Sequence, residues 1–413
     1  MDTTTTESTQ LLFDPARHAP VPDRPWDESE ARDAITRIAA AAEAGFDAAR
    51  QGWKPHPLDD DDTPYAVQAQ LYSGAAGVIW ALRHLAAQGA IKVHTDFTAT
   101  IAGLPQRAEA ALAQERHGSA SYLLGQSGAL LLQWTATRQA STADALFEVV
   151  RSNLRNPVLE ALWGSPGTLI AAIHMAEATG QARWSDLLQQ GMQILLDEMH
   201  TDPETGAWIW TQDLYGRQQR LLGAGHGFVG NVYPAFRAAH LLDPATVATF
   251  QQRALKTLQA TALHDTHGGI NWHPAIDAAR VAGRLPLVHD CHGAPGVVSR
   301  LAAAPRDPEW DALLRGAGEL VWQAGPLTTK GASLCHGTPG SAMACLKLWR
   351  RFAEPDWLAR ARVLAMHSID LVEQHRARYR AGRHSLWTGD LGVACLLWSC
   401  IVEDDNVPTL DRF

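Results

Sequence analysis

Seven copies of a Gly-x-x-Gly pattern, each at the start of an apolar run, constrain the fold of this chain most strongly. The copies begin at Gly74, Gly125, Gly164, Gly227, Gly293, Gly337 and Gly389. A single such pattern carries almost no information, but seven in the same context indicate an internal repeat. The mean separation of about 52 residues accommodates two helices and two loops in each repeat.

The residues after each glycine pair predict buried helices, and the stretches between the copies predict exposed ones. After the last copy, residues 393–398 are apolar nearly all round, which is typical of a helix buried on every side. Residues 184–199 and 245–263 have one polar face, as outer helices do. We therefore expect an all-α fold, an (α/α)7 toroid with seven inner and seven outer helices. An open solenoid of the same repeats is the alternative.

Glycine at the start of each inner helix suggests where chemistry takes place. It lets backbones approach closely and adopts positive φ at little cost. The first N–H groups of a helix lack partners within the helix, so we expect them to point into the mouth of the ring and to favour anionic groups there. The mouth is therefore the place to look for a functional site.

Composition and charge exclude several classes of function. The chain has 35 Lys and Arg against 44 Asp and Glu, a net charge of −9, with no long basic run. This argues against nucleic acid or an anionic membrane as the main partner. The first residues lack the pattern of a signal peptide, and no run of 18 apolar residues predicts a membrane span. We expect a cytoplasmic protein with a polar, poorly ordered segment over residues 1–30 and one catalytic toroid domain over residues 31–413.

The five cysteines do not suggest a disulfide framework, because they are few and odd in number. Three lie in apolar helical contexts and are expected to be small buried side chains: Cys345, Cys395 and Cys400. The other two, Cys291 and Cys335, stand in glycine-rich turns, and each is followed by His-Gly.

These two Cys-His turns predict a metal site. Each precedes an inner helix, so closing the ring would bring the turns together at adjacent mouths. Thiolate and imidazole groups suit Zn²⁺. Four candidate ligands are present, Cys291, His292, Cys335 and His336, so spacing alone does not decide whether His292 binds. Two repeat-related turns without a metal are the alternative.

The turns also resemble the motifs of LanC-like proteins, the lanthionine synthetase C or lantibiotic cyclase family. Residues 288–297 resemble the family's W-C-H-G-A-P-G stretch, and residues 330–337 resemble its second C-H-G block. Residues 223–230, Gly-Ala-Gly-His-Gly-Phe-Val-Gly, are similar to its G-x-x-H-G-x-x-G motif. The ordered glycine pairs carry the resemblance from about residue 70 to the end of the sequence.

The resemblance implies a zinc enzyme on a barrel of seven inner and seven outer helices. Bacterial cyclases of the family add peptide cysteine thiols to dehydroalanine or dehydrobutyrine, and eukaryotic-like members add glutathione. The implied partners are a dehydrated peptide or a protein containing a dehydroamino acid, and glutathione. The implied zinc ligands are Cys291, Cys335 and His336, and the implied catalytic histidine is His226.

Three residues are candidates for catalysis by this resemblance. Zinc would deprotonate a thiol, whose free pKa of about 8.5 leaves little thiolate at neutral pH. His226 would then protonate the α-carbon of the enolate that forms. His292 stands where the eukaryotic-like branch carries His and the lantibiotic cyclases often carry Tyr. Lys330 matches a lysine of the family, and could steady the enolate or a substrate carboxylate.

Departures from the family pattern leave other functions open. Gln126 stands where an acid/base Asp is usual, Asp290 where Trp is usual, and Thr388 where Glu is expected. Loss of the titratable group would suit a zinc-stabilised peptide-binding scaffold without catalysis. A carbohydrate-active toroid is the other alternative. It needs two carboxylates at the mouth, and Asp213 with Asp290 or Asp390 are its candidates.

Overall fold

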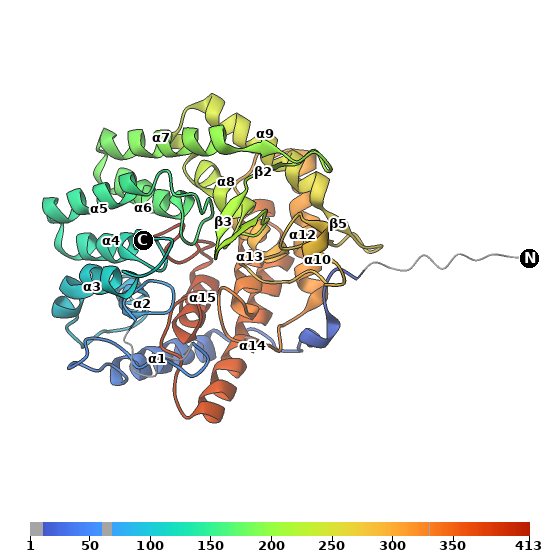
Figure 1. The fold of residues 1–413 in the computed structure, drawn as a ribbon. Coiled ribbons are helices and arrows are strands. Elements are labelled where there is room, and N and C mark those ends of the chain that lie inside the picture. Colours follow the sequence, from blue (N-terminus) through green and yellow to red (C-terminus); the bar gives the residue numbers. More distant parts are fainter. Residues whose placement is uncertain (1–10, 60–67, 330) are drawn as a thin grey trace, which may run out of the picture.

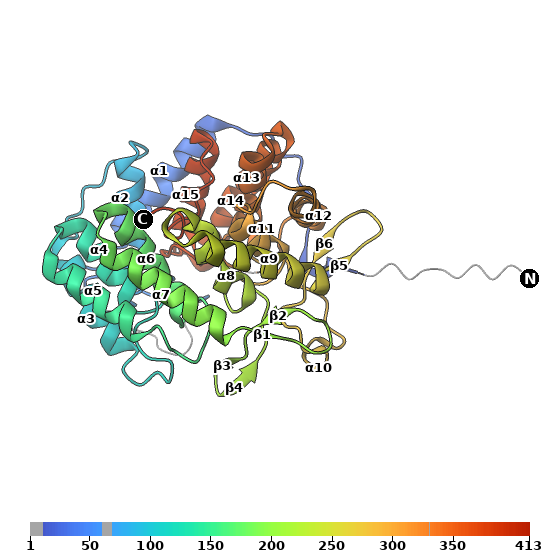
Figure 2. The same ribbon diagram turned by 90° about the horizontal axis from the view of Figure 1, so that it is seen from above.

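The computed structural model describes residues 11–59, 68–329 and 331–413, and shows a ring of helices within a ring of helices (Figures 1 and 2). The inner helices are α2 (Ala75–Ala87), α4 (Gln126–Thr137), α6 (Ser165–Thr179), α8 (Phe228–Arg237), α11 (Ala294–Leu301), α13 (Thr338–Phe352) and α15 (Asp390–Val402). The outer helices are α1 (Glu28–Ala44), α3 (Thr98–Ala111), α5 (Ala140–Ser152), α7 (Ala182–Glu198), α9 (Pro244–Thr261), α12 (Pro308–Ala324) and α14 (Pro355–Tyr379).

The inner ring is closed. Each inner helix contacts the next one along the chain, and α15 contacts α2. The outer helix α1 packs against α15, so the first helix of the chain covers the last one. The toroid prediction is confirmed, and the open-solenoid alternative is wrong.

Burial distinguishes the two rings as their sequences predict. In α15 every residue from Asp390 to Cys400 is buried, because this helix is enclosed by its neighbours on all sides. In α7 the buried residues recur at helical spacing on one face, from Trp184 to Leu195, and the opposite face is polar. The core therefore lies between the two rings and around the inner helices.

The Gly-x-x-Gly pairs mark the start of every inner helix. The first glycine is the N-cap in all seven. A Cβ on the second glycine would overlap the carbonyl oxygen of the residue six positions earlier, in all seven copies. Close approach is thus the general reason for glycine. Among the N-cap glycines, only Gly227 (φ 150°) and Gly293 (φ 119°) have the positive φ that was also expected.

The first N–H groups of these helices are not free, contrary to the sequence-based expectation. In five inner helices the first N–H donates to the carbonyl seven residues earlier: Ala75, Gln126, Phe228, Thr338 and Asp390. In α11 the Ala294 N–H donates to Asn271 Oδ1 at 2.9 Å. In the five helices the preceding loop folds back onto the first turn and satisfies this donor, so these helix starts do not serve as general anion sites.

Short strands and short helices fill the longer connections. The antiparallel pairs are β1 (His200–Thr201) with β2 (Trp208–Ile209), β3 (Gln212–Leu214) with β4 (Arg217–Gln219), and β5 (Leu263–His264) with β6 (Ile270–Asn271). The short helices are η1 (Pro15–Arg17), η2 (Ala239–Leu241) and α10 (Ala278–Val281). The β3–β4 hairpin and α10 project from one face of the molecule (Figure 2).

The segment before α1 is held against the ring. Asn271 Nδ2 donates to the Leu12 carbonyl at 2.8 Å, and the Ala19 N–H donates to the Pro326 carbonyl at 2.9 Å. Leu12 is buried and belongs to the main hydrophobic core. Across the part of the chain that the structure describes, no helix is long and apolar enough to cross a membrane.

Candidate metal centre

A belt of backbone hydrogen bonds joins the loops at the mouth of the ring. In six of the seven repeats the residue two positions before the glycine pair takes part: the Gly225 N–H donates to Cys291, Cys291 to Cys335, Cys335 to Trp387, Trp387 to Tyr72, and Tyr72 to Leu123. The belt therefore runs from one repeat to the next and continues from the last repeat to the first. It fixes Cys291 and Cys335 at equivalent positions of adjacent repeats, with 3.3 Å between the Cys291 nitrogen and the Cys335 oxygen.

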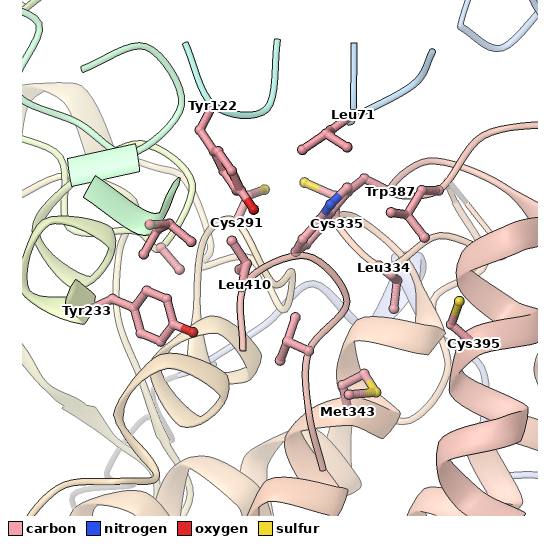
Figure 3. Close-up of a cluster of buried hydrophobic side chains, with 14 of the residues drawn as sticks. Leu71, Tyr122, Tyr233, Cys291, Leu334, Cys335, Met343, Trp387, Cys395 and Leu410 are labelled. Atoms are coloured by element: carbon pink, nitrogen blue, oxygen red, sulfur yellow. The ribbon is translucent and has the colours of Figure 1, made fainter. Parts of the chain in front are cut away.

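The residues two positions before the seven glycine pairs surround one cavity. All seven line it: Tyr72, Leu123, Leu162, Gly225, Cys291, Cys335 and Trp387. The space between its lining residues is about 640 Å³, a volume that includes open solvent, and residues of the inner helices such as Ile170 and Tyr233 also line it. His226 and His336 lie one position nearer to their helices and line it too. Figure 3 shows the two cysteines close together with Tyr122, Trp387 and Leu410 around them.

Cys291, Cys335 and His336 form a set of metal donors. One donor atom from each residue lies within 4.8 Å of the donor atoms of the other two. Among the described residues, this is the one group of three such donors. Cys335 Sγ lies 3.6 Å from His336 Nε2. Tetrahedral zinc with its usual bond lengths holds sulfur and nitrogen ligands about 3.6 Å apart, so the residues present fit this ion. His292 is outside this set.

The surroundings of the two thiols shift their pKa values in opposite directions. A hydrogen bond from the Cys291 thiol lowers the pKa of Cys335, and the nearby His336 lowers it further against the effect of burial. The same hydrogen bond, together with burial, raises the pKa of Cys291. Cys335 is thus ready to be a thiolate, and two buried sulfurs beside an imidazole are a soft donor set suited to zinc.

His226 is held by a buried carboxylate that the sequence reasoning missed. Its Nδ1 lies 2.7 Å from Glu160 Oε2, and the Glu160 side chain is 0 % exposed. The Glu160 carboxylate also accepts the N–H groups of Leu162 and Trp163. Burial lowers the pKa of His226, but the charge of Glu160 and its hydrogen bond outweigh this and leave the pKa raised. His226 can therefore carry a proton near neutral pH.

His292 lies beside His226 and not among the metal donors. The two rings are stacked with centroids 5.8 Å apart. Burial lowers the pKa of His292 to about 3, and the charges of the surrounding histidines add to this effect. Its Nδ1 is buried without a hydrogen-bond partner. His292 is thus a neutral imidazole that packs against His226.

The Asp290 and Arg300 side chains form a buried ion pair on the wall of the same cavity. Arg300 Nη2 donates to Asp290 Oδ2 at 2.6 Å, and Arg300 Nη1 donates to Asp290 Oδ1 at 3.2 Å. Burial raises the pKa of Asp290, and the charge of Arg300 opposes that rise. Arg300 was not anticipated, because only the closed ring places it beside the cysteine turn.

The C-terminal tail forms the floor of the cavity. Leu410 lines it, and the tyrosine hydroxyl groups of the wall point to the tail: Tyr122 donates to the Thr409 carbonyl, and Tyr233 donates to Asp411 Oδ1 at 2.6 Å. Figure 3 shows the Tyr122 and Tyr233 rings on this side of the lumen. The hydroxyl groups are therefore engaged, and the rings present apolar surface to the cavity.

The other candidate residues that the structure describes do not line the cavity. Lys330 is outside the described residues. Gln126 does not line the cavity, and its Nε2 donates to Ser119 Oγ at 2.6 Å. Thr388 is buried, with its hydroxyl 2.8 Å from Ser385 Oγ. The carboxylate beside His226 comes from Glu160 in the third repeat, so Gln126 does not deprive the site of an acidic group.

The carboxylates named for carbohydrate chemistry do not converge. Asp213 pairs with Arg116 at 2.8 Å on the surface. Asp390 accepts the Arg383 N–H at 3.0 Å and does not line the cavity. Asp290 is bound to Arg300. These three residues therefore offer no facing pair of carboxylates, and the two buried cysteines would have no role.

Comparisons with known proteins identify the family and the fold. The model of the family "Lanthionine synthetase C-like protein" matches residues 65–411. The glutathione S-transferase LANCL1 of Danio rerio is 35% identical over 257 residues, a match that covers 58% of this chain and 58% of that protein. The solved structure of nisin cyclase superimposes with a TM-score of 0.63 at 14% identity, covering 91% of this chain and 95% of the cyclase.

The three comparisons carry different weight. The nisin cyclase likeness, at such low identity, shows the shared toroid fold. The relative from Danio rerio is matched over little more than half of its length, so its activity as a whole is not thereby assigned. The family model covers most of the sequence and includes all seven glycine pairs. Family and fold together support a lanthionine-synthetase-like function, and the chain belongs to the lanthionine synthetase C-like family.

Proposed function

We propose that this protein is a zinc enzyme that adds a thiol to dehydroalanine or dehydrobutyrine in a peptide or protein, and that glutathione is the thiol donor. The observation that carries the proposal is the set of Cys291, Cys335 and His336 donors opening onto the cavity that His226 shares. Three protein ligands would hold zinc and leave one position for a substrate, as in catalytic zinc sites.

The reaction is an addition of S–H across a carbon–carbon double bond. Zinc, when bound, would supply a thiolate at neutral pH by lowering the pKa of the substrate thiol. The sulfur forms a bond to the β-carbon, the π electrons move to the α-carbon side as an enolate, and the thiol proton passes to solvent. His226 gives its proton to the α-carbon and regains one from solvent.

Glu160 makes His226 suitable for this step. The carboxylate accepts the Nδ1–H of the imidazolium at 2.7 Å, which leaves Nε2 as the nitrogen that delivers the proton. The raised pKa increases the protonated fraction of His226 at any given pH. His292, as a neutral imidazole stacked on His226, adds no competing positive charge. These contacts support an acid role for His226.

The choice of glutathione rests on two features. The relative from Danio rerio is named a glutathione S-transferase, and His292 occupies the position where the glutathione-adding branch carries histidine. Asp290 and Arg300 pair with each other within the cavity, so neither is free to bind a charged group of glutathione. The carboxylate and ammonium groups of glutathione would therefore lie at the rim of the cavity. A peptide cysteine as donor, which would close a thioether ring, is the second candidate and is separated by the assay below.

Elemental analysis of the purified protein tests the metal. We expect one zinc per chain, and loss of most of it in Cys335→Ala and Cys291→Ala. Cys345→Ala and Cys395→Ala are matched controls, since both cysteines are buried in inner helices away from the cavity. Stoichiometric zinc surviving in both site variants contradicts the assignment.

Incubation of a dehydroalanine peptide with glutathione and the zinc-loaded protein tests the reaction. We expect a product heavier by one glutathione, no product with His226→Ala, and retained zinc in that variant. His267→Ala is the control, because His267 is exposed and lies outside the cavity. Ring closure of a cysteine-containing peptide without any glutathione adduct would favour the cyclase reading. If neither product forms, the scaffold without catalysis becomes the better explanation.

A further inference from the structure

The Asp290–Arg300 ion pair has no role in the reaction as described above. Both side chains are almost completely buried, at 6% and 5% exposure, and the guanidinium contacts both carboxylate oxygens. A buried ion pair gives little net stability, because the cost of removing two charges from water offsets their attraction. Its presence in a wall that otherwise consists mainly of apolar and aromatic residues therefore calls for a functional reason.

The position of the carboxylate suggests that reason. Asp290 directly precedes Cys291 and lines the same cavity as Cys335 and His336. Its carboxylate, bound to Arg300, is not among the donor atoms that cluster within 4.8 Å of one another. Carboxylate oxygen is an accepted zinc ligand in proteins. A free carboxylate at this place would compete with a substrate thiol for the metal, or repel the thiolate.

Arg300 is well placed to prevent this competition. It comes from the last turn of α11, ten residues after Asp290, and its planar guanidinium occupies both oxygens at once. The guanidinium carbon lies 5.7 Å from the Tyr233 ring centroid and 5.9 Å from that of Trp387. These rings flank the arginine in the lumen, so the carboxylate is held by a group whose own orientation is fixed.

We propose that Arg300 is a positioning residue that keeps the Asp290 carboxylate from the metal, and so reserves the fourth coordination position for the substrate thiol. The inference rests on the zinc assignment proposed above. It concerns this chain in particular, because Asp290 stands where the LanC-like pattern has tryptophan, which cannot bind a metal. In this chain the positive charge of Arg300 balances the negative charge of Asp290.

The direct test uses cobalt(II) in place of zinc and 2-mercaptoethanol as an uncharged thiol probe. In the unaltered protein, thiol binding should change the visible spectrum of cobalt. In Arg300→Met, where Asp290 has lost its partner, we expect the apparent Kd of the thiol to rise at least about tenfold, the scale on which outer contacts affect metal sites. Competition with a chelator should show the metal held at least as tightly as before.

Rescue by a second change separates positioning from a structural role. In Asp290→Leu/Arg300→Met both charges are gone, so we expect thiol binding and glutathione addition to return to within about threefold of the unaltered protein. Arg300→Lys keeps the charge but cannot hold both oxygens, and should give an intermediate loss. This variant also serves if Arg300→Met does not fold, which thermal unfolding will show.

Three outcomes overturn the inference. Unchanged thiol affinity in Arg300→Met and Arg300→Lys means that Asp290 does not compete for the position. A double variant as weak as Arg300→Met, with metal bound equally in both, means that Arg300 binds the substrate itself. Loss of metal in Arg300→Met means that the pair supports the site structurally. If the unaltered protein binds no zinc or cobalt, the proposed function fails first, which distinguishes the two failures.

Discussion

At the scale of single residues, the local chemistry of the site depends on a few buried carboxylates. Glu160 has the most direct effect, because it determines the charge of His226. In Glu160→Gln the single amide oxygen can still accept the Trp163 N–H, while the amide nitrogen replaces the oxygen that accepts the Leu162 N–H and faces His226. The negative charge beside the imidazole is lost.

We expect Glu160→Gln to lower the pKa of His226. The acid form would then disappear at a lower pH, so the alkaline limb of the kcat/KM profile for glutathione addition should move to lower pH. The raised pKa of His226 also contributes to stability. This contribution is fully present below the pKa of histidine in the unfolded chain, and it is lost as the pH rises through the pKa of His226 in the folded protein. Glu148→Gln, which affects an exposed pair with Arg151, is the control. An unmoved alkaline limb with zinc retained would show that His226 is not the acid.

Asp390 gives a second prediction at this scale. Burial raises its pKa from 3.8 to about 7. The folded protein therefore holds a proton that the unfolded chain has already lost, so stability should fall between pH 4 and pH 7 and level off above. Asp390→Asn can still accept the Arg383 N–H and should be more stable at pH 8 by up to about 4 kcal/mol. Denaturant unfolding at pH 8 and pH 4 measures this, and an equal effect at both values contradicts it.

At the scale of elements, the glycine pair is a steric device that couples a loop to a helix. The second glycine leaves no room for a Cβ against the carbonyl six residues earlier, and in five of the seven inner helices the same folded-back loop satisfies the first N–H of the helix. The glycine pattern and the hydrogen bonds of the first helical N–H groups therefore both follow from the folded-back loop. This explains why seven copies persist in repeats whose other residues differ.

We expect Gly77→Ala to destabilise the protein by about 1–3 kcal/mol or more, because its Cβ would overlap the Leu71 carbonyl and contact the Leu386 side chain. Gly103→Ala is the matched control within the outer helix α3, where a Cβ meets only Arg107 Cδ at 4.0 Å. That substitution should stabilise by up to about 1 kcal/mol. Urea denaturation distinguishes the two, and equal effects would remove the steric explanation.

At the scale of the whole molecule, the ring is completed by segments from the two ends of the described chain. Helix α1 covers α15, and the tail crosses the lumen and supports the cavity from below. Asp411 anchors this tail, since it accepts the Tyr233 hydroxyl and pairs with the buried Lys347 at 2.8 Å. The floor of the site is therefore a tertiary feature that no single repeat contains.

Asp411→Ala should lower stability by about 2–4 kcal/mol, because Lys347 loses its nearer carboxylate and keeps only Asp405 at 3.3 Å. Removing the lysine charge as well, in Asp411→Ala/Lys347→Met, should recover much of the loss. Thermal unfolding measures both variants, with Arg412→Ala as a control for the exposed part of the tail. A double variant no more stable than the single one would mean that the hydrogen bonds that Asp411 accepts from the Tyr233 hydroxyl and the Val407 N–H carry the effect.

The sequence alone determined the features that depend on neighbours along the chain. Apolar periodicity after each glycine pair predicts inner helices, and equal register of the Cys291 and Cys335 turns predicts that their sulfurs meet when the ring closes. The expectation of free helix N-termini was wrong, because a donor's partner depends on how the preceding loop folds back. Short strands such as β3 and β4 carry too few residues to give a periodic signal.

Only the tertiary structure decided the contacts between repeats. Glu160 and His226 are 66 residues apart and meet because repeats three and four are adjacent in the ring. Arg300 meets Asp290 because α11 follows its own mouth loop down the lumen. Local steric rules fix the shape of each repeat, whereas ring closure fixes which side chains face one another, and that depends on the packing of all seven repeats together. The sequence motifs therefore determine which donor residues are present at the centre, and the closed ring determines which side chains surround them.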